Sequence, residues 1–128
     1  MDSPNPIGFT FLLLFGAARL VISWAPMDEP GAARTRTGSM HNVLATVFFA
    51  SETVAAFLYG GSFVHDDALG GIAGPSTVLA WCMAVVSAAI LATSLAKPLR
   101  PYFGLIERLL YVAVITWMIT VAVAVINA

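Results

Sequence analysis

The sequence predicts an all-helical integral membrane protein whose 128 residues form a single bundle of four transmembrane helices. Two observations predict this class. Hydrophobic residues make up 59% of the chain and charged residues only 10%, whereas about a quarter of the residues in a soluble domain are charged. The apolar residues also gather in four stretches, each near the roughly twenty residues that a helix needs to cross a hydrocarbon core about 30 Å thick. We expect helices over about 7–25, 40–60, 72–96 and 103–127.

Prolines delimit the first stretch, residues 7–25. Pro4 and Pro6 precede it, and Pro26 follows it. Proline is tolerated in the first turn of a helix but not in its interior. Trp24 suits the interface between membrane and water.

The second stretch, residues 40–60, carries the most informative polar residues. His41 and Glu52 lie eleven positions apart, so they project from nearly the same side of a helix. Ionisable groups at membrane depth are costly unless they face protein or water. We therefore expect this side of the helix to face the bundle interior, with the other helices covering it.

The third stretch, residues 72–96, has Pro75 in its first turn and ends at Lys97 and Pro98. The fourth stretch, residues 103–127, follows after a short connection. The first and third stretches each carry small residues along one face, which lets membrane helices approach closely. These two faces consist of Gly8, Leu12, Gly16, Arg19 and Ser23, and of Ser76, Ala80, Ala84, Ser87, Leu91 and Ser94.

Basic residues in the connections predict the topology. Arg34 and Arg36 lie between the first two stretches, and Lys97 and Arg100 lie between the last two, whereas the termini and the connection 61–71 contain no Lys or Arg. Positive residues mark the cytoplasmic side, so both termini are expected to be external. The external connection contains His65, Asp66 and Asp67, which we interpret as solvated turn residues, with a cation site as the alternative.

Several function classes lack support in the sequence. The net charge of −1 and the lack of a basic cluster give no sign of a surface that binds nucleic acid. No HExxH, GxSxG, Walker or Rossmann string is present, and the two histidines fall on opposite faces of the membrane, which excludes a bis-histidine haem. A zinc site would need His41 with Asp28, Glu29, Glu52 or Glu107, and their spacing does not favour one. We therefore expect no cofactor and no metal, and the lone Cys82 is interpreted as an apolar filler.

Five ionisable residues are expected to converge in the cytoplasmic half of the bundle as candidate ligand-binding or proton-handling groups. By helix rise, Arg19 and Glu52 lie about 9 Å apart in depth, so they would pair either directly or through water or hydroxyl groups. The alternatives are that the arginines reach the lipid headgroups, that the acidic residue of the last helix pairs locally, and that Glu52 is neutral and structural. The five residues are Arg19, His41, Glu52, Glu107 and Arg108.

Short motifs in the chain resemble those of a bacterial multi-pass membrane family, domain of unknown function 998. The first is a P-x-D segment, the second a T-x-x-G-x-x-H entry to the following helix, and the third a G-L-x-E-R-L opening of the last helix. Members usually have six spans, so this chain resembles their last four and lacks an N-terminal pair. The resemblance implies no activity. The matching residues are Pro26, Asp28, Thr35, Gly38, His41, Glu107 and Arg108.

These features predict a small protein of the bacterial cytoplasmic (inner) membrane. We expect an accessory or assembly subunit, or a bundle that binds lipid or a small ligand in its polar cytoplasmic half. The alternative is a proton-coupled transporter or intramembrane enzyme that uses Glu52 and His41. Membrane lipids and a homo-oligomer or larger membrane complex are the expected partners, because small-residue faces on two helices favour association.

Overall fold

The computed structural model describes residues 5–29 and 31–128, and this part of the chain is helical throughout, with short connections and no strand. The four α-helices confirm the predicted fold class. Two short 3₁₀ helices, η1 and η2, lead into α3 and α4. The bounds are α1 Pro6–Ile22, α2 Arg36–Phe63, η1 Gly70–Ile72, α3 Ala73–Leu95, η2 Lys97–Tyr102 and α4 Phe103–Asn127.

Three described segments are long and apolar enough to cross a membrane, namely Arg36–Phe63, Gly70–Thr93 and Pro98–Asn127. The helix α1 is also apolar but has only 17 residues, which gives a length of about 25 Å. It ends at Ile22, three residues before the predicted end. By contrast, α2 starts four residues earlier than predicted, at Arg36, because Thr35 caps it: the Thr35 hydroxyl accepts a hydrogen bond from the Gly38 amide.

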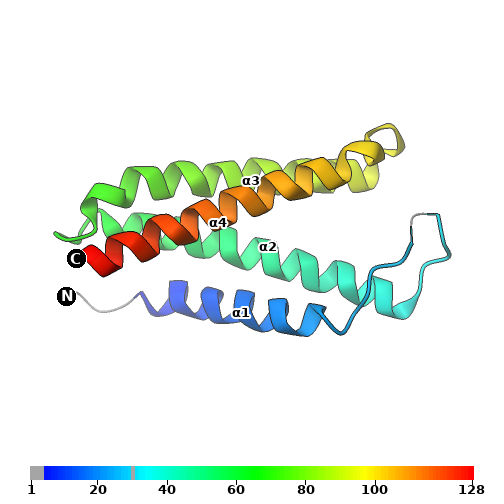
Figure 1. Ribbon diagram of the computed structural model, residues 1–128, viewed down its shortest axis with the longest axis horizontal. Helices are drawn as coiled ribbons and strands as arrows, with labels where there is room; N and C mark the ends of the chain where they lie inside the picture. The colour runs from blue at the N-terminus through cyan, green and yellow to red at the C-terminus, as the bar shows by residue number, and fades with distance from the viewer. Residues whose placement is uncertain (1–4, 30) are drawn as a thin grey trace.

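The helices run antiparallel, and α2 lies between α1 and α3 (Figure 1). The backbone of α1 packs against α2, whereas α3 packs against both α2 and α4. The start of α1 and the end of α4 lie at one end of the bundle, and the connections 23–35 and 96–102 lie at the other (Figure 1). We call the end of the bundle that holds these two connections the basic end, because Arg34, Arg36 and Arg100 lie there.

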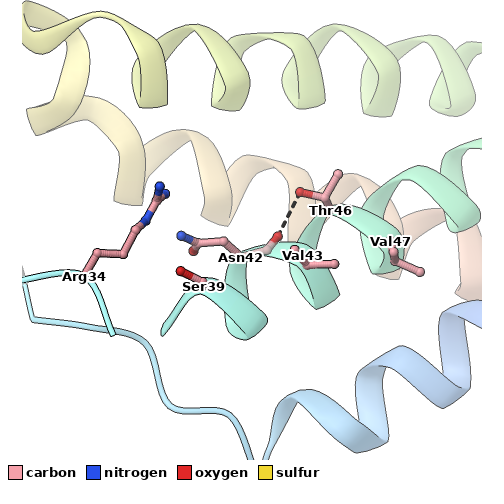
Figure 2. A pocket seen from close by; sticks show the side chains of 6 residues that line it. All are labelled: Arg34, Ser39, Asn42, Val43, Thr46 and Val47. Atoms are coloured by element: carbon pink, nitrogen blue, oxygen red, sulfur yellow. Dashed lines mark hydrogen bonds between the residues drawn. The ribbon is translucent and has the colours of Figure 1, made fainter. Parts of the chain in front are cut away.

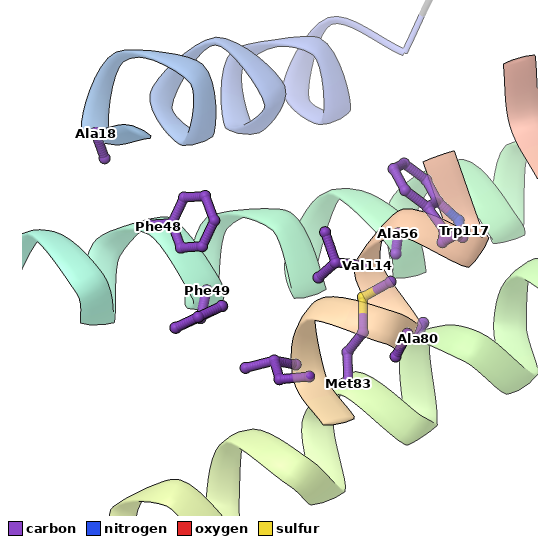
Figure 3. Packing of buried hydrophobic residues seen from close by; sticks show 10 residues of the cluster. Ala18, Phe48, Phe49, Ala56, Ala80, Met83, Val114 and Trp117 are labelled. Atoms are coloured by element: carbon purple, nitrogen blue, oxygen red, sulfur yellow. The ribbon is translucent and has the colours of Figure 1, made fainter. Parts of the chain in front are cut away.

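Aromatic and small side chains form the core between α2 and its neighbours. Phe48 points towards α1, where its ring stacks on Phe15, with 4.8 Å between centroids, while Phe49 points to the other side of α2 (Figure 3). Tyr111 of α4 contacts the rings of both Phe48 and Phe49. The buried cluster consists of Ala18, Phe48, Phe49, Ala56, Ala80, Met83, Leu110, Ala113, Val114 and Trp117.

Close contacts fix the end of the bundle opposite the basic end. A Cβ added to Gly60 of α2 would lie 2.9 Å from the Thr77 hydroxyl of α3, so the two helices meet there at close range. The Trp117 indole donates a 2.7 Å hydrogen bond to the Ser76 hydroxyl and so joins α4 to α3. Asn5 caps α1 and donates to the Leu58 carbonyl of α2. The splay between α2 and α3 therefore opens towards the basic end (Figure 1).

Candidate functional site

A small polar network folds the connection between α1 and α2. The Asp28 carboxylate accepts hydrogen bonds from both the amide and the hydroxyl of Thr35, and Thr35 in turn caps α2. A Cβ at Gly38 would overlap the Asp28 carboxylate, so a larger residue here would displace that carboxylate from its present position. We call Asp28, Thr35 and Gly38 the connection latch.

Hydrogen bonding lowers the pKa of Asp28 below its ordinary value of 3.8. The largest cause is the hydrogen bond from the Thr35 hydroxyl, followed by that from the Thr35 amide, and Arg34 adds a smaller electrostatic effect. The latch therefore contains an ionised carboxylate at neutral pH.

His41 joins the first turns of α2 to the end of the α1 segment. Its Nδ1 lies 2.7 Å from the carbonyl oxygen of Ala25, a residue that is completely buried. A carbonyl oxygen can only accept, so Nδ1 carries the proton and donates. In the neutral ring this leaves Nε2 as an unprotonated acceptor. In the T-x-x-G-x-x-H motif, Thr35 therefore caps α2, and His41 binds the Ala25 carbonyl, which fixes the orientation of its imidazole ring.

A cavity of about 560 Å³ lies beside His41, between α2, α3 and α4. We call it the bundle cavity. Its three ionisable lining residues lie near the basic end, and the rest of the lining is mostly apolar with a few amide and hydroxyl groups. Its lining residues are Met27, Arg34, His41, Asn42, Ala45, Thr46, Phe49, Ala50, Thr53, Val54, Ser87, Ile90, Leu91, Phe103, Glu107 and Leu110.

A second, shallower cavity of about 360 Å³ adjoins it on the outer side of α2 and shares Arg34, Asn42 and Thr46 with it. Figure 2 shows Arg34 extending from the connection alongside the first turns of α2, with the polar ends of Ser39 and Asn42 turned towards it. Arg34 therefore stands where both cavities meet at the basic end.

Two of the five predicted ionisable residues reach the bundle cavity, His41 and Glu107. Glu107 is half-buried and makes no hydrogen bond or ion pair with any residue that the structure describes, so it does not pair with Arg108, which is exposed. The other three residues lie elsewhere.

Arg19 lies in the last turn of α1, because the helix ends at Ile22. It is therefore nearer the basic end than predicted. Its guanidinium carbon lies 5.4 Å from the centroid of the Phe48 ring and 5.7 Å from that of Tyr111. These are cation–π distances, so Arg19 binds two aromatic rings rather than a carboxylate.

Glu52 is completely buried, and neither carboxylate oxygen has a hydrogen-bond partner in the described part of the chain. Direct pairing of Glu52 with Arg19, one of the arrangements expected from the sequence, is therefore absent. Glu52 is also not among the residues that line the bundle cavity. An ionised carboxylate without donors is strongly disfavoured at such a site, so the neutral, protonated side chain fits it best.

The sequence interpretation missed several polar residues of the bundle cavity. Asn42, Thr46 and Thr53 follow one another at intervals of four and seven along one face of α2, and this helical spacing was a readable signal. Ser87 was assigned only to packing. It lines the cavity wall, yet its hydroxyl is covered and has no hydrogen-bond partner among the described residues.

Metal ligands do not converge at this site. No group of three or more His, Cys, Asp or Glu side chains comes together within residues 5–29 and 31–128. In the connection between α2 and α3, the Asp66 carboxylate accepts hydrogen bonds from the amides of Ala68 and Leu69. Asp66 therefore organises the turn.

The fold and the site together define a class: a small helical membrane protein with a ligand-sized cavity whose ionisable lining residues gather at one end of the bundle. The chain belongs to the family described as protein of unknown function (DUF998), whose model matches residues 3–124. No curated protein and no solved structure matches this chain.

Proposed function

We propose that the protein binds a membrane lipid or a similar amphipathic molecule in the bundle cavity. The observation that carries this proposal is the lining of the cavity. All three ionisable lining residues, Arg34, His41 and Glu107, lie towards the basic end, while Phe49, Val54 and Leu110 lie further along the helices. An amphipathic ligand has the same division between a polar head and an apolar chain.

The size and position of the cavity support the same function. Its volume of about 560 Å³ falls within the roughly 300–1,000 Å³ of small-molecule sites. Several of its α2 residues, among them Thr46, Ala50 and Val54, are exposed at the surface of the bundle. That surface faces hydrocarbon in a membrane, so a lipid chain can enter sideways from the bilayer.

The proton-handling alternative has less support. His41 is turned to the Ala25 carbonyl on one side and to the bundle cavity on the other. Glu52 is completely buried and lies outside the cavity lining. Proton transfer between His41 and Glu52 would need a water-filled route, whereas lipid binding needs none.

Photo-crosslinking in nanodiscs tests the proposal. A lipid with a photoactivatable group in its acyl chain should label the partly exposed cavity residues Thr53 and Ile90, as mapped by peptide mass spectrometry. Ala50→Phe fills the cavity and should abolish this labelling. The matched control is Ala88→Phe, which adds the same ring at an exposed alanine of α3 outside both cavity linings and should leave the labelling unchanged. Cavity labelling that is absent, or that survives Ala50→Phe, contradicts lipid binding at this site.

A further inference from the structure

We propose that the bundle cavity selects a lipid whose headgroup joins a phosphate to a primary ammonium group. This inference rests on the proposed function, because it names the chemical class of the ligand at that same site. It is carried by three groups at the basic end of the cavity whose charges and hydrogen-bonding roles differ, namely Arg34, His41 and Glu107.

The two charged groups offer complementary contacts to a zwitterion. Arg34 is exposed and makes no hydrogen bond with the described residues, and Glu107 likewise has no partner among them. The nearby Asp28 carboxylate is already bound by Thr35. A guanidinium binds phosphate through several N–H donors, and a carboxylate binds ammonium, so one ligand carrying both charges would satisfy both side chains.

His41 further restricts which kind of ammonium group the cavity can bind. Because Nδ1 donates to the Ala25 carbonyl, Nε2 of the neutral ring is an acceptor, and His41 is one of the residues that line the cavity. A primary ammonium has three N–H donors and can serve both this nitrogen and the Glu107 carboxylate. A quaternary ammonium has no N–H donor, so it attracts Glu107 only through its charge and makes no hydrogen bond to either group. An anionic headgroup such as that of phosphatidylglycerol would place a negative charge near Glu107 without a compensating positive charge.

The apolar part of the cavity favours a lipid over a free phosphoamine. Phe49, Ile90 and Leu110 line the same space as the charged residues, and a water-soluble headgroup would leave this part of the cavity without an occupant. Binding should therefore need both the headgroup and an acyl chain.

The test uses the cavity labelling described above as its readout, with unlabelled competitors of identical acyl chains. Phosphatidylethanolamine should compete about tenfold better than phosphatidylcholine or phosphatidylglycerol, as expected when a charge-assisted hydrogen bond is gained or lost. Glycerophosphoethanolamine, the same headgroup without chains, should not compete. Equal competition by the three lipids, or competition by the free headgroup, overturns the inference.

Two pairs of variants assign the selectivity to residues. Glu107→Gln should remove the advantage over phosphatidylglycerol, whereas Glu29→Gln, an exposed acidic residue outside the cavity lining, should keep it. Arg34→Gln should weaken competition by all three phospholipids, and Arg36→Gln, exposed at the start of α2 and outside the lining, should not.

If Glu107→Gln and Glu29→Gln behave alike, the headgroup inference fails while lipid binding stands. If the unmodified protein shows no cavity labelling at all, the proposed function itself fails.

Discussion

At the scale of single residues, the motifs of the α1–α2 connection have a structural explanation. Asp28, Thr35 and Gly38 form the connection latch, and His41 fastens α2 to Ala25. These residues are the positions at which the sequence resembles short family motifs, but the motifs gave them no structural role. It did not predict their mutual contacts, because the path of the chain between residues 26 and 35 brings them together and no periodicity describes such a path.

The overlap at Gly38 leads to the first prediction. Gly38→Ala should lower the melting temperature in detergent by a few degrees, because the new methyl group displaces the Asp28 carboxylate and with it the hydrogen bonds to Thr35. Gly104→Ala is the matched control, since a Cβ there meets nothing within 4 Å. An unchanged melting temperature for Gly38→Ala would show that the latch does not contribute to stability.

The second prediction concerns acidic pH. The hydrogen bonds from Thr35 lower the pKa of Asp28, so the ionised form is favoured by folding. The resulting stabilisation is present above the ordinary pKa of 3.8 and is lost as the pH falls through the lowered value. Melting curves between pH 7 and pH 2 should show this loss in the unmodified protein. Asp28→Asn should have a smaller acid-dependent loss, and an equal loss in both proteins would assign it to other carboxyl groups.

The third prediction concerns Glu52 and Arg19. Glu52→Met should stabilise the protein by about 1–3 kcal/mol, because it removes a buried carboxyl group without hydrogen-bond partners. Arg19→Leu should cost about 0.5–1 kcal/mol through loss of the cation–π contacts.

Since no contact links the two residues, their effects in the double variant should add to within about 0.5 kcal/mol. Thermal unfolding of the two single variants and the double variant measures this. A double variant that departs from additivity by 1 kcal/mol or more would reveal a pairing in solution that is absent here.

At the scale of whole helices, hydropathy located the four elements and misplaced some of their ends. The apolar stretch suggested that α2 begins at Met40, yet Thr35 and Gly38 supply a cap, and a polar first turn of the helix follows it. Ser23 likewise ends α1 before the apolar residues end. Hydropathy reports contact with lipid, whereas capping decides where a helix begins and ends.

The meeting of α2 and α3 at Gly60 gives the fourth prediction. Gly60→Ala should destabilise the protein by about 1–3 kcal/mol, because its Cβ would lie 2.9 Å from the Thr77 hydroxyl and force the helices apart. The neighbouring Gly61→Ala should be neutral or stabilising by up to about 1 kcal/mol, because nothing lies within 4 Å of its Cβ and alanine favours the helix. Thermal unfolding in nanodiscs compares the two. Equal effects of the two changes would show that α2 and α3 do not need their close approach.

At the scale of the whole molecule, the arrangement of four helices could be predicted from the sequence, but the bundle cavity could not. The cavity exists because α2 and α3 meet closely at Gly60 and separate towards the basic end. Such a divergence depends on the crossing of two helices far from the residues that line the space. Of the five ionisable groups predicted to cluster, His41 and Glu107 line the cavity, whereas Arg19 lies on aromatic rings, Glu52 is buried and Arg108 is exposed.

The fifth prediction concerns topology. The start of α1 and the end of α4 lie at the same end of the bundle, away from the basic end (Figure 1). If the basic end is cytoplasmic, then in a Cys82→Ala background Ala33→Cys should react with an impermeant thiol reagent only from the cytoplasmic side. His65→Cys should react only from outside. The reverse pattern would show that the basic residues do not determine the orientation.

The attachment of α1 at two places restricts how this helix can move. Near its start, Asn5 donates to the Leu58 carbonyl of α2, and beyond its end the Ala25 carbonyl binds His41 of α2. The two α2 positions, His41 and Leu58, are seventeen residues apart, or about 25 Å of helix, which matches the length of α1 itself. Adding or deleting one residue within α1 would shift one attachment by about 1.5 Å and turn it by about 100°, so both could no longer form together. The length of α1 is thereby set by its neighbour α2.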